Sequence, residues 1–156
     1  MQRKKLPIGI QTFAKIREDN YYYVDKTALA LKLINGGGHY FLSRPRRFGK
    51  SLFLDTLAEL FAGNESLFRG LHCHERWDWT RRYPVIRLSF GSGRLERREQ
   101  LDIRIHDLLR VNAERLGLPL PRPQGQDVPG CFGELIRQAE RQAGQRVVVL
   151  VDEYDK

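Results

Sequence analysis

The chain has 156 residues, of which 41% are hydrophobic and 29% charged, and this composition excludes wholesale disorder and indicates one globular domain over residues 1–156. No apolar run is long enough to cross a bilayer, no secretory signal peptide is evident, and two cysteines are too few for a disulfide framework. We therefore expect a cytoplasmic protein with reduced thiols, and the net charge of +8 favours polyanions such as nucleotide phosphates and nucleic acid.

The segment before residue 40 predicts one short strand and one helix. The basic start, Gln2–Lys5, is expected to fray, and Tyr21–Val24 predicts a short strand or extended segment. Asp25 stands where it can cap a helix through Leu33 and Ile34, and the run Gly36–Gly38 would end that helix.

A strand, a turn and a helix are predicted around the sequence SRPRRFGKS, residues 43–51. The apolar run in Tyr40–Ser43 predicts a buried strand before the turn. After the turn, apolar residues recur at helical spacing from Lys50 to about Ala62, and Gly63 stands at the expected C-cap.

The tripeptide Gly49-Lys50-Ser51 matches the end of a phosphate-binding P-loop. The N-terminus of the predicted helix directs unpaired N–H groups and the positive end of its dipole at the turn, which favours an anion there. Lys50 would then reach the β- and γ-phosphates, and the Ser51 hydroxyl would ligate Mg²⁺. The first glycine of the usual motif is replaced by Arg44, and Pro45 removes one amide donor, so the turn departs from that pattern.

The second half of the chain alternates strands and helices. Val85–Phe90 predicts a strand, and an apolar stripe after it predicts a long helix ending near Gly117. Prolines make Leu118–Gly130 a loop, and a further helix beginning near Phe132 is capped by Gly144. The chain then closes on a strand, Val147–Asp152, and this alternation predicts an α/β fold with a parallel sheet.

Two carboxylates follow this last strand. Asp152 and Glu153 stand at its carboxyl end, where open α/β sheets bind ligands, and this is the Walker B pattern. Asp152 would hold Mg²⁺ through its water shell, and Glu153 would orient the attacking water as general base. Alternatively, Lys50 and Asp152 are surface charges at the ends of elements, but the two motifs together favour a nucleotide site.

Several segments together resemble the predicted AAA-ATPases of bacteria and archaea, whose P-loop reads RPRRFGKS, so Arg44 is a feature of that family. Further matching segments are Leu6–Phe13, Tyr21–Ala30, Glu59–Leu71, Tyr83–Phe90 and Val151–Lys156. The resemblance covers most of the chain except residues 93–146. It implies a P-loop NTPase-like parallel sheet flanked by helices, in the branch with an additional strand between the P-loop and Walker B strands.

The site expected from these motifs binds ATP with Mg²⁺. Backbone amides of Phe48–Ser51, Gly49 included, would cradle the phosphates, and Arg46 and Arg47 would add positive charge. Lys50 and Glu153 are the candidate catalytic residues, and the Ser51 hydroxyl would bind the metal together with Asp152. By resemblance alone, Tyr23, Asp25 and Lys26 would lie near the adenine or ribose, although packing and capping explain the same residues.

The resemblance also implies that the sheet is incomplete here. In that branch a strand carrying a γ-phosphate sensor follows Walker B, later elements supply an arginine finger, and many relatives end in a domain similar to PD-(D/E)XK nucleases. Without that strand, Tyr40–Ser43 and Val147–Asp152 would pair with each other or leave a gap one strand wide. We therefore expect the N-terminal fragment of a longer ATPase, or a decayed copy, that is unstable alone, and its expected partners are a missing C-terminal domain or further copies in a homo-oligomer.

Two other functions remain open from the sequence. The arginines around residues 44–47 could bind nucleic acid as a non-catalytic module, and a non-functional fragment of a longer ATPase would bind nothing. The arginines at 94–104 alternate with acidic residues, which favours a solvated helix face. The cluster His72-Cys73-His74 lacks the spacing of a metal site, and we expect no metal there.

Overall fold

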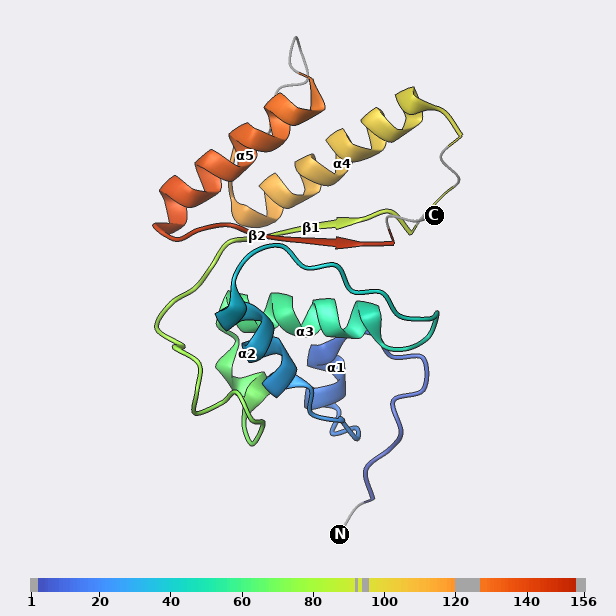
Figure 1. The fold of residues 1–156 in the computed structure, drawn as a ribbon, viewed down its shortest axis with the longest axis vertical. Coiled ribbons are helices and arrows are strands. Elements are labelled where there is room, and N and C mark those ends of the chain that lie inside the picture. The colour runs from blue at the N-terminus through green and yellow to red at the C-terminus, as the bar shows by residue number, and fades with distance from the viewer. Residues whose placement is uncertain (1–2, 92, 94–95, 120–126, 154–156) are drawn as a thin grey trace. The chain divides into compact units, whose positions relative to one another are not determined.

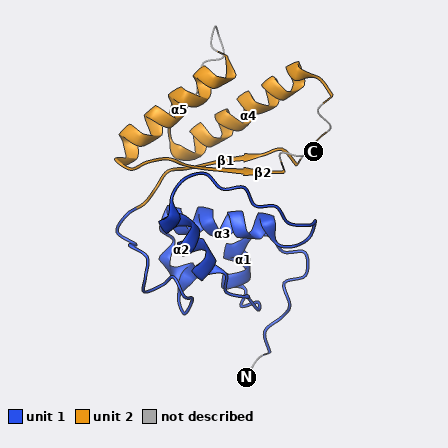
Figure 2. Ribbon diagram, viewed as in Figure 1, with its two compact units in different colours: residues 1–81 blue, residues 82–156 orange. Residues whose placement is uncertain are grey.

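A computed structural model describes residues 3–91, 93, 96–119 and 127–153. The chain divides into two compact units, residues 1–81 and 82–156 (Figure 2). Among the described residues, no helix combines the length and the apolar character that a membrane span requires.

The first unit is helical. It contains α1 (Phe13–Glu18), α2 (Thr27–Gly36), α3 (Lys50–Ala62) and the short 3₁₀ helix η1 (Glu65–Phe68) (Figure 1). Its largest fully buried apolar side chains are Phe13, Ile16, Leu60 and Phe68. The rings of Phe13 and Phe68 lie 4.8 Å apart between their centroids, so α1 and η1 share one core.

Polar contacts connect distant parts of this unit. The buried carboxylate of Asp55 in α3 accepts a hydrogen bond of 2.7 Å from the backbone N–H of Phe13, at the start of α1. Arg17 in α1 donates to the carbonyl of Leu67 at 2.7 Å and to the carbonyl of Arg69 at 2.6 Å. These bonds satisfy backbone groups at the ends of short helices, which lack partners within the helix itself.

The predicted strand Tyr40–Ser43 is wrong. These residues lie outside every helix and strand of the described chain, and the side chains of Tyr40 and Phe41 are 56% and 69% exposed. An apolar run supplies strand propensity, but a strand forms only when a neighbour takes up its backbone hydrogen bonds. The one sheet of the described residues consists of two strands, Val85–Ser89 and Val148–Asp152.

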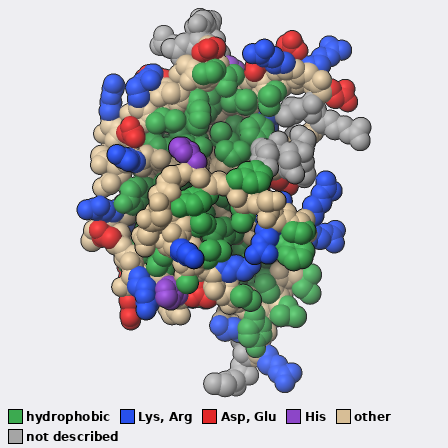
Figure 3. Space-filling model, viewed as in Figure 1, with side chains coloured by type: hydrophobic (Ala, Val, Ile, Leu, Met, Phe, Trp, Pro, Cys, Tyr) green, Lys and Arg blue, Asp and Glu red, His purple; other side chains and the backbone are tan. Residues whose placement is uncertain are grey.

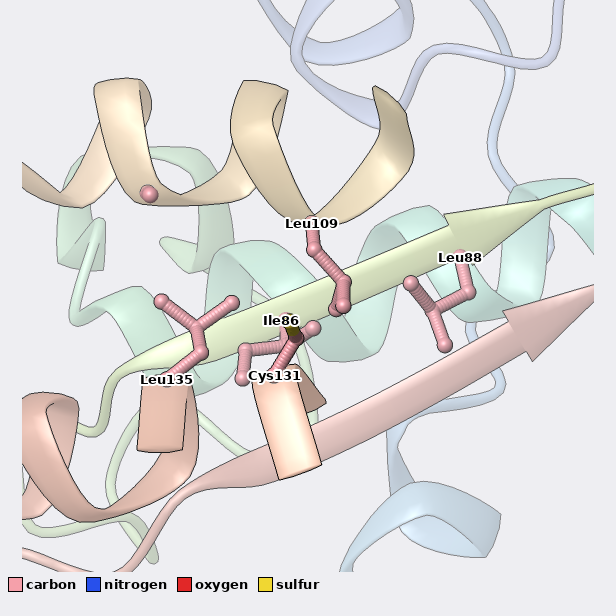
Figure 4. Close-up of a cluster of buried hydrophobic side chains, with 6 residues drawn as sticks. Ile86, Leu88, Leu109, Cys131 and Leu135 are labelled. Carbon is pink, nitrogen blue, oxygen red and sulfur yellow. The ribbon is translucent and has the colours of Figure 1, made fainter. Parts of the chain in front are cut away.

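The second unit is α/β. It contains β1 (Val85–Ser89), α4 (Arg98–Leu116), α5 (Val128–Ala143) and β2 (Val148–Asp152). The strands pair in parallel, from Val85 opposite Val148 to Ser89 opposite Asp152. The two helices lie against the sheet, and their core cluster combines side chains of β1, α4 and α5 (Figures 1 and 4): Ile86, Leu88, Leu109, Ala113, Cys131 and Leu135.

The α/β class and the parallel pairing predicted from the sequence are confirmed, but within the described part of the chain the sheet has two strands only. Glycines end the helices as expected, with Gly63, Gly117 and Gly144 left-handed after α3, α4 and α5. Helix α5 begins earlier than predicted, because Asp127 accepts a hydrogen bond from Gly130 N–H and a proline suits the first helical turn. Residues 120–126 of the predicted loop lie outside the described residues.

Candidate functional site

Residues 44–51, here called the GKS loop, lead directly into α3. Gly49 precedes the helix with φ 77° and ψ 21°, in the left-handed region, and its carbonyl accepts the first helical bond from Phe53 N–H at 2.9 Å. Among the described residues, no side chain caps the first amides of α3, and its first turn has no acidic residue. The N-terminus of α3 is therefore electropositive and open to an anion.

The backbone of the GKS loop has a second left-handed residue, Arg47, with φ 64°. Left-handed residues next to helical ones turn successive N–H groups toward one point, and such concavities bind phosphate groups in proteins. Gly49 adopts this conformation without steric strain, whereas for a residue with a Cβ, such as Arg47, the left-handed conformation is less favourable by about 1–2 kcal/mol. Strain of this kind is concentrated at functional sites.

The side chains of the GKS loop differ in their exposure. Arg44, Arg46 and Arg47 are exposed, whereas Lys50 and Ser51 are half-buried in the first turn of α3. The side chain of Phe48 is 59% exposed, so its ring is not packed in the core, and the group of Phe48 that the predicted site uses is its backbone amide. The site residues predicted in the first unit thus lie in one turn and in the first turn of α3.

A further ammonium lies beside this loop. The Nζ atom of Lys26, just before α2, is 3.9 Å from the position that a Cβ of residue 49 would occupy. The family resemblance implied a place near the adenine or ribose for Lys26, and its spacing from residue 49 in the sequence gave no sign of this contact. The structure adds Lys26 to the positive charges around the start of α3.

The second-unit part of the predicted site lies at the carboxyl end of β2. Asp152 and Glu153 are half-buried. The carbonyl of Asp152 accepts a hydrogen bond from Phe90 N–H at 3.1 Å, and its Oδ1 accepts one from Glu153 N–H at 2.9 Å. Glu153 is left-handed, with φ 53°, so the chain turns sharply immediately after the strand. Lys50 and Ser51 belong to the first unit, whereas Asp152 and Glu153 belong to the second, and each pair of residues is described within its own unit.

Glu153 lies against Gly91, a residue that sequence reasoning missed. A Cβ built on Gly91 would stand 1.4 Å from Glu153 Oε2, so the carboxylate occupies the space a side chain there would need. The two residues are distant in the sequence and come together because β1 and β2 pair in parallel. A glycine shortly after a strand was the available signal, but it did not reveal which group approaches it.

The cysteine between His72 and His74 has a structural role. The N–H of Cys73 donates to Thr27 Oγ1 at 3.1 Å, and the N–H of His72 donates to Asp25 Oδ2 at 2.7 Å. Burial raises the pKa of the Cys73 thiol. In the part of the chain that the structure describes, no three potential ligands gather as a metal site would require.

Two arginines of α4, Arg104 and Arg110, form ion pairs within their own helix. Arg110 contacts Asp107 at 2.6 Å and Glu114 at 2.8 Å, and Arg104 lies 3.7 Å from Asp107. Lys and Arg side chains are likewise interspersed with Asp and Glu on the face shown in Figure 3. Of the arginines for which the sequence predicted a solvated helix face, Arg104 takes part in these pairs.

Comparison with known proteins places the chain in a family. It is 66% identical over 157 residues to an "Uncharacterized protein in vnfD 5'region" of Azotobacter chroococcum mcd 1, a match that covers the whole chain and 30% of that protein. No solved structure matches it. The family model AAA-ATPase_like, described as "Predicted AAA-ATPase", matches residues 7–156. The resemblance seen in the sequence is thereby confirmed, and the chain belongs to the predicted AAA-ATPase family.

Proposed function

We propose that this chain is an ATP-binding domain in which the GKS loop holds the phosphates of Mg²⁺-ATP. The observation that carries the proposal is the start of α3. A left-handed Gly49 precedes uncapped helix amides, and the first two helical residues are Lys50 and Ser51. Membership of the predicted AAA-ATPase family supports the same function.

Each group of the loop has a role in this proposal. The backbone N–H groups of Phe48–Ser51 donate to phosphate oxygens, and the Lys50 ammonium neutralises the β- and γ-phosphates. Arg46 and Arg47 add positive charge from the exposed side of the turn. Hydrogen bonds to charged groups are stronger than neutral ones, so these contacts favour a triphosphate over a neutral ligand.

The oxygen donors proposed for Mg²⁺ suit that ion. The Ser51 hydroxyl and the Asp152 carboxylate are hard oxygen ligands, the type that Mg²⁺ prefers. The Glu153 N–H donates to Oδ1 of Asp152, which orients this carboxylate at the end of β2. When bound, Mg²⁺ would offset the negative charge of the phosphates.

Hydrolysis belongs to a second stage of the proposal. Glu153 is the proposed general base that orients the attacking water, with Lys50 stabilising the charge that develops on the phosphates. The chain spans 30% of the length of the related protein. We therefore propose hydrolysis for a longer protein that also carries the γ-phosphate sensor and arginine finger which the family resemblance implies.

Calorimetric titration with Mg²⁺-ATP tests the binding proposal. Replacing Lys50 with Ala should weaken binding at least about tenfold, because a charge-assisted phosphate contact is lost. The matched control is Lys32→Ala, since Lys32 is an exposed lysine of α2. Equal affinities of Lys50→Ala and the unmodified chain would end the proposal.

The same preparation tests the nucleic-acid alternative. A single-stranded oligonucleotide is titrated at two salt concentrations, with and without Mg²⁺-ATP. Affinity that falls steeply with salt and ignores Mg²⁺-ATP would favour backbone-phosphate binding by the arginines. ATP binding that depends on Lys50, with no such oligonucleotide binding, supports the nucleotide site.

A further inference from the structure

We propose that Gly91 is a positioning residue for Glu153, because only a residue without a Cβ leaves the space that the Glu153 carboxylate occupies at the end of β1. The catalytic meaning of this placement rests on the proposed function of Glu153 as general base. The placement itself is a property of the second unit, to which both residues belong.

The contact is close enough that any side chain at residue 91 would displace the Glu153 carboxylate. A Cβ there would lie 1.4 Å from Glu153 Oε2, 2.6 Å from its Cδ and 3.3 Å from its Oε1. Gly91 does not have a positive φ, in contrast to Gly93 and Gly117. Its φ therefore does not call for glycine, and the feature that does is the approach of the Glu153 carboxylate.

The strand pairing and the turn after β2 bring Glu153 to this place. Ser89 stands opposite Asp152 in the parallel register, and the ladder continues with the bond from Phe90 N–H to the Asp152 carbonyl. Glu153 follows with φ 53°, held by the bond from its own N–H to Asp152 Oδ1. A left-handed glutamate is an uncommon conformation, and such outliers are found most often at functional sites.

A side chain at residue 91 would move the carboxylate farther than catalysis tolerates. Non-bonded carbon and oxygen atoms need about 3.5 Å, so the carboxylate would shift by roughly 2 Å. Catalytic groups must be held within about 0.5 Å, and a misplacement of about 1 Å can cost about a hundredfold in rate. The group that moves is the end of a flexible side chain, so the fold of the unit should survive.

Kinetics of Gly91→Ala in the full-length protein test this inference. We expect kcat for ATP hydrolysis to fall at least about tenfold with KM for ATP unchanged, because the GKS loop still binds the nucleotide. Glu153→Gln should show the same pattern, and the double variant should be no slower than Glu153→Gln alone. The matched control is Gly133→Ala in α5, where an added Cβ would approach its nearest atom, Arg137 Nη1, only to 3.4 Å.

Wild-type kcat in Gly91→Ala would overturn the inference. NMR of the present chain provides a readout that does not require hydrolysis. Replacing Glu153 with Ala should shift the Gly91 amide resonance and leave that of Gly133 unchanged. An unmoved Gly91 resonance would overturn the placement, whereas a shifted one in a protein that neither binds nor hydrolyses ATP would refute the proposed function and keep the placement.

Discussion

The side-chain amide of Asn112 pairs with the backbone of Arg87 as a neighbouring strand would. Its Oδ1 accepts from Arg87 N–H at 2.9 Å, and its Nδ2 donates to the Arg87 carbonyl at 2.8 Å. Asn112 belongs to α4 and is only 3% exposed. One helix residue thus bonds both backbone groups of Arg87 in β1, and these bonds join α4 to the strand.

Replacing Asn112 with Leu should lower the free energy of unfolding of the second unit by about 2–4 kcal/mol. The reason is that the N–H and the carbonyl of Arg87 would lose these part-buried hydrogen bonds, at about 1–3 kcal/mol each. Urea denaturation followed by circular dichroism measures the change. Val111→Ala, at a 46% exposed neighbour, is the control and should change stability by less than about 1 kcal/mol. Equal midpoints for Asn112→Leu and the unmodified chain would contradict the pairing.

Asp25 makes the stability of the first unit depend on pH in the acid range. Partial burial raises the pKa of this carboxyl, but hydrogen bonds from Thr27 and from His72 N–H together outweigh it, so its pKa lies below the ordinary value. Because the pKa of Asp25 is lower in the folded state than in the unfolded state, its ionised carboxylate contributes to stability at pH values above the unfolded pKa of about 3.9. This contribution is lost as the pH falls through the lower pKa of the folded state.

The corresponding prediction compares Asp25→Asn with the unmodified chain. The stability advantage of the unmodified chain over the variant should be constant above about pH 5 and should shrink as the pH falls below about 4. Denaturant titrations at several pH values measure this difference, and subtraction removes the other titrating groups. A difference that is independent of pH would refute the role of Asp25.

Lys26 should contribute to nucleotide binding. Lys26→Met removes the ammonium that lies beside Gly49 and keeps most of the side-chain volume. We expect the affinity for Mg²⁺-ATP to fall about fivefold, because an exposed ammonium near the phosphates is worth less than a buried one. The control, Lys32→Met, changes an exposed lysine of α2. Equal affinities of the two variants for Mg²⁺-ATP would show that Lys26 does not contribute to nucleotide binding.

Arg47 allows the strain of the GKS loop to be separated from its charge. Arg47→Gly and Arg47→Ala both remove the guanidinium, but only Gly relieves the left-handed φ of 64°. The Gly variant should therefore be more stable than the Ala variant by about 1 kcal/mol, while both bind Mg²⁺-ATP more weakly than the unmodified chain. Identical stabilities would show that residue 47 is not left-handed in solution.

Local signals in the sequence predicted the helices best. The ends of α3, α4 and α5 follow from glycines that directly terminate apolar stripes, since capping depends on neighbouring residues. The GKS loop was found for the same reason. Helix α1 was not predicted, because it is six residues long and its first amide is satisfied by Asp55, 42 residues away in the chain.

Pairings between distant segments were not predictable. Tyr40–Ser43 has the composition of a strand, but composition does not specify a pairing strand, and these residues belong to no strand of the described structure. The approach of Glu153 to Gly91 depends on the register of β1 and β2, and that of Lys26 to Gly49 depends on the packing of the helical unit. Local patterns leave such contacts open, and they are the ones that position the candidate site.

Amide chemical shifts during a titration with Mg²⁺-ATP test most directly whether the GKS loop is the phosphate site. The account predicts that the largest shifts occur at Gly49, Lys50 and Ser51, and that Lys50→Ala greatly reduces them while Lys32→Ala does not. Shifts confined to residues outside the GKS loop, or none at saturating nucleotide, would contradict the account.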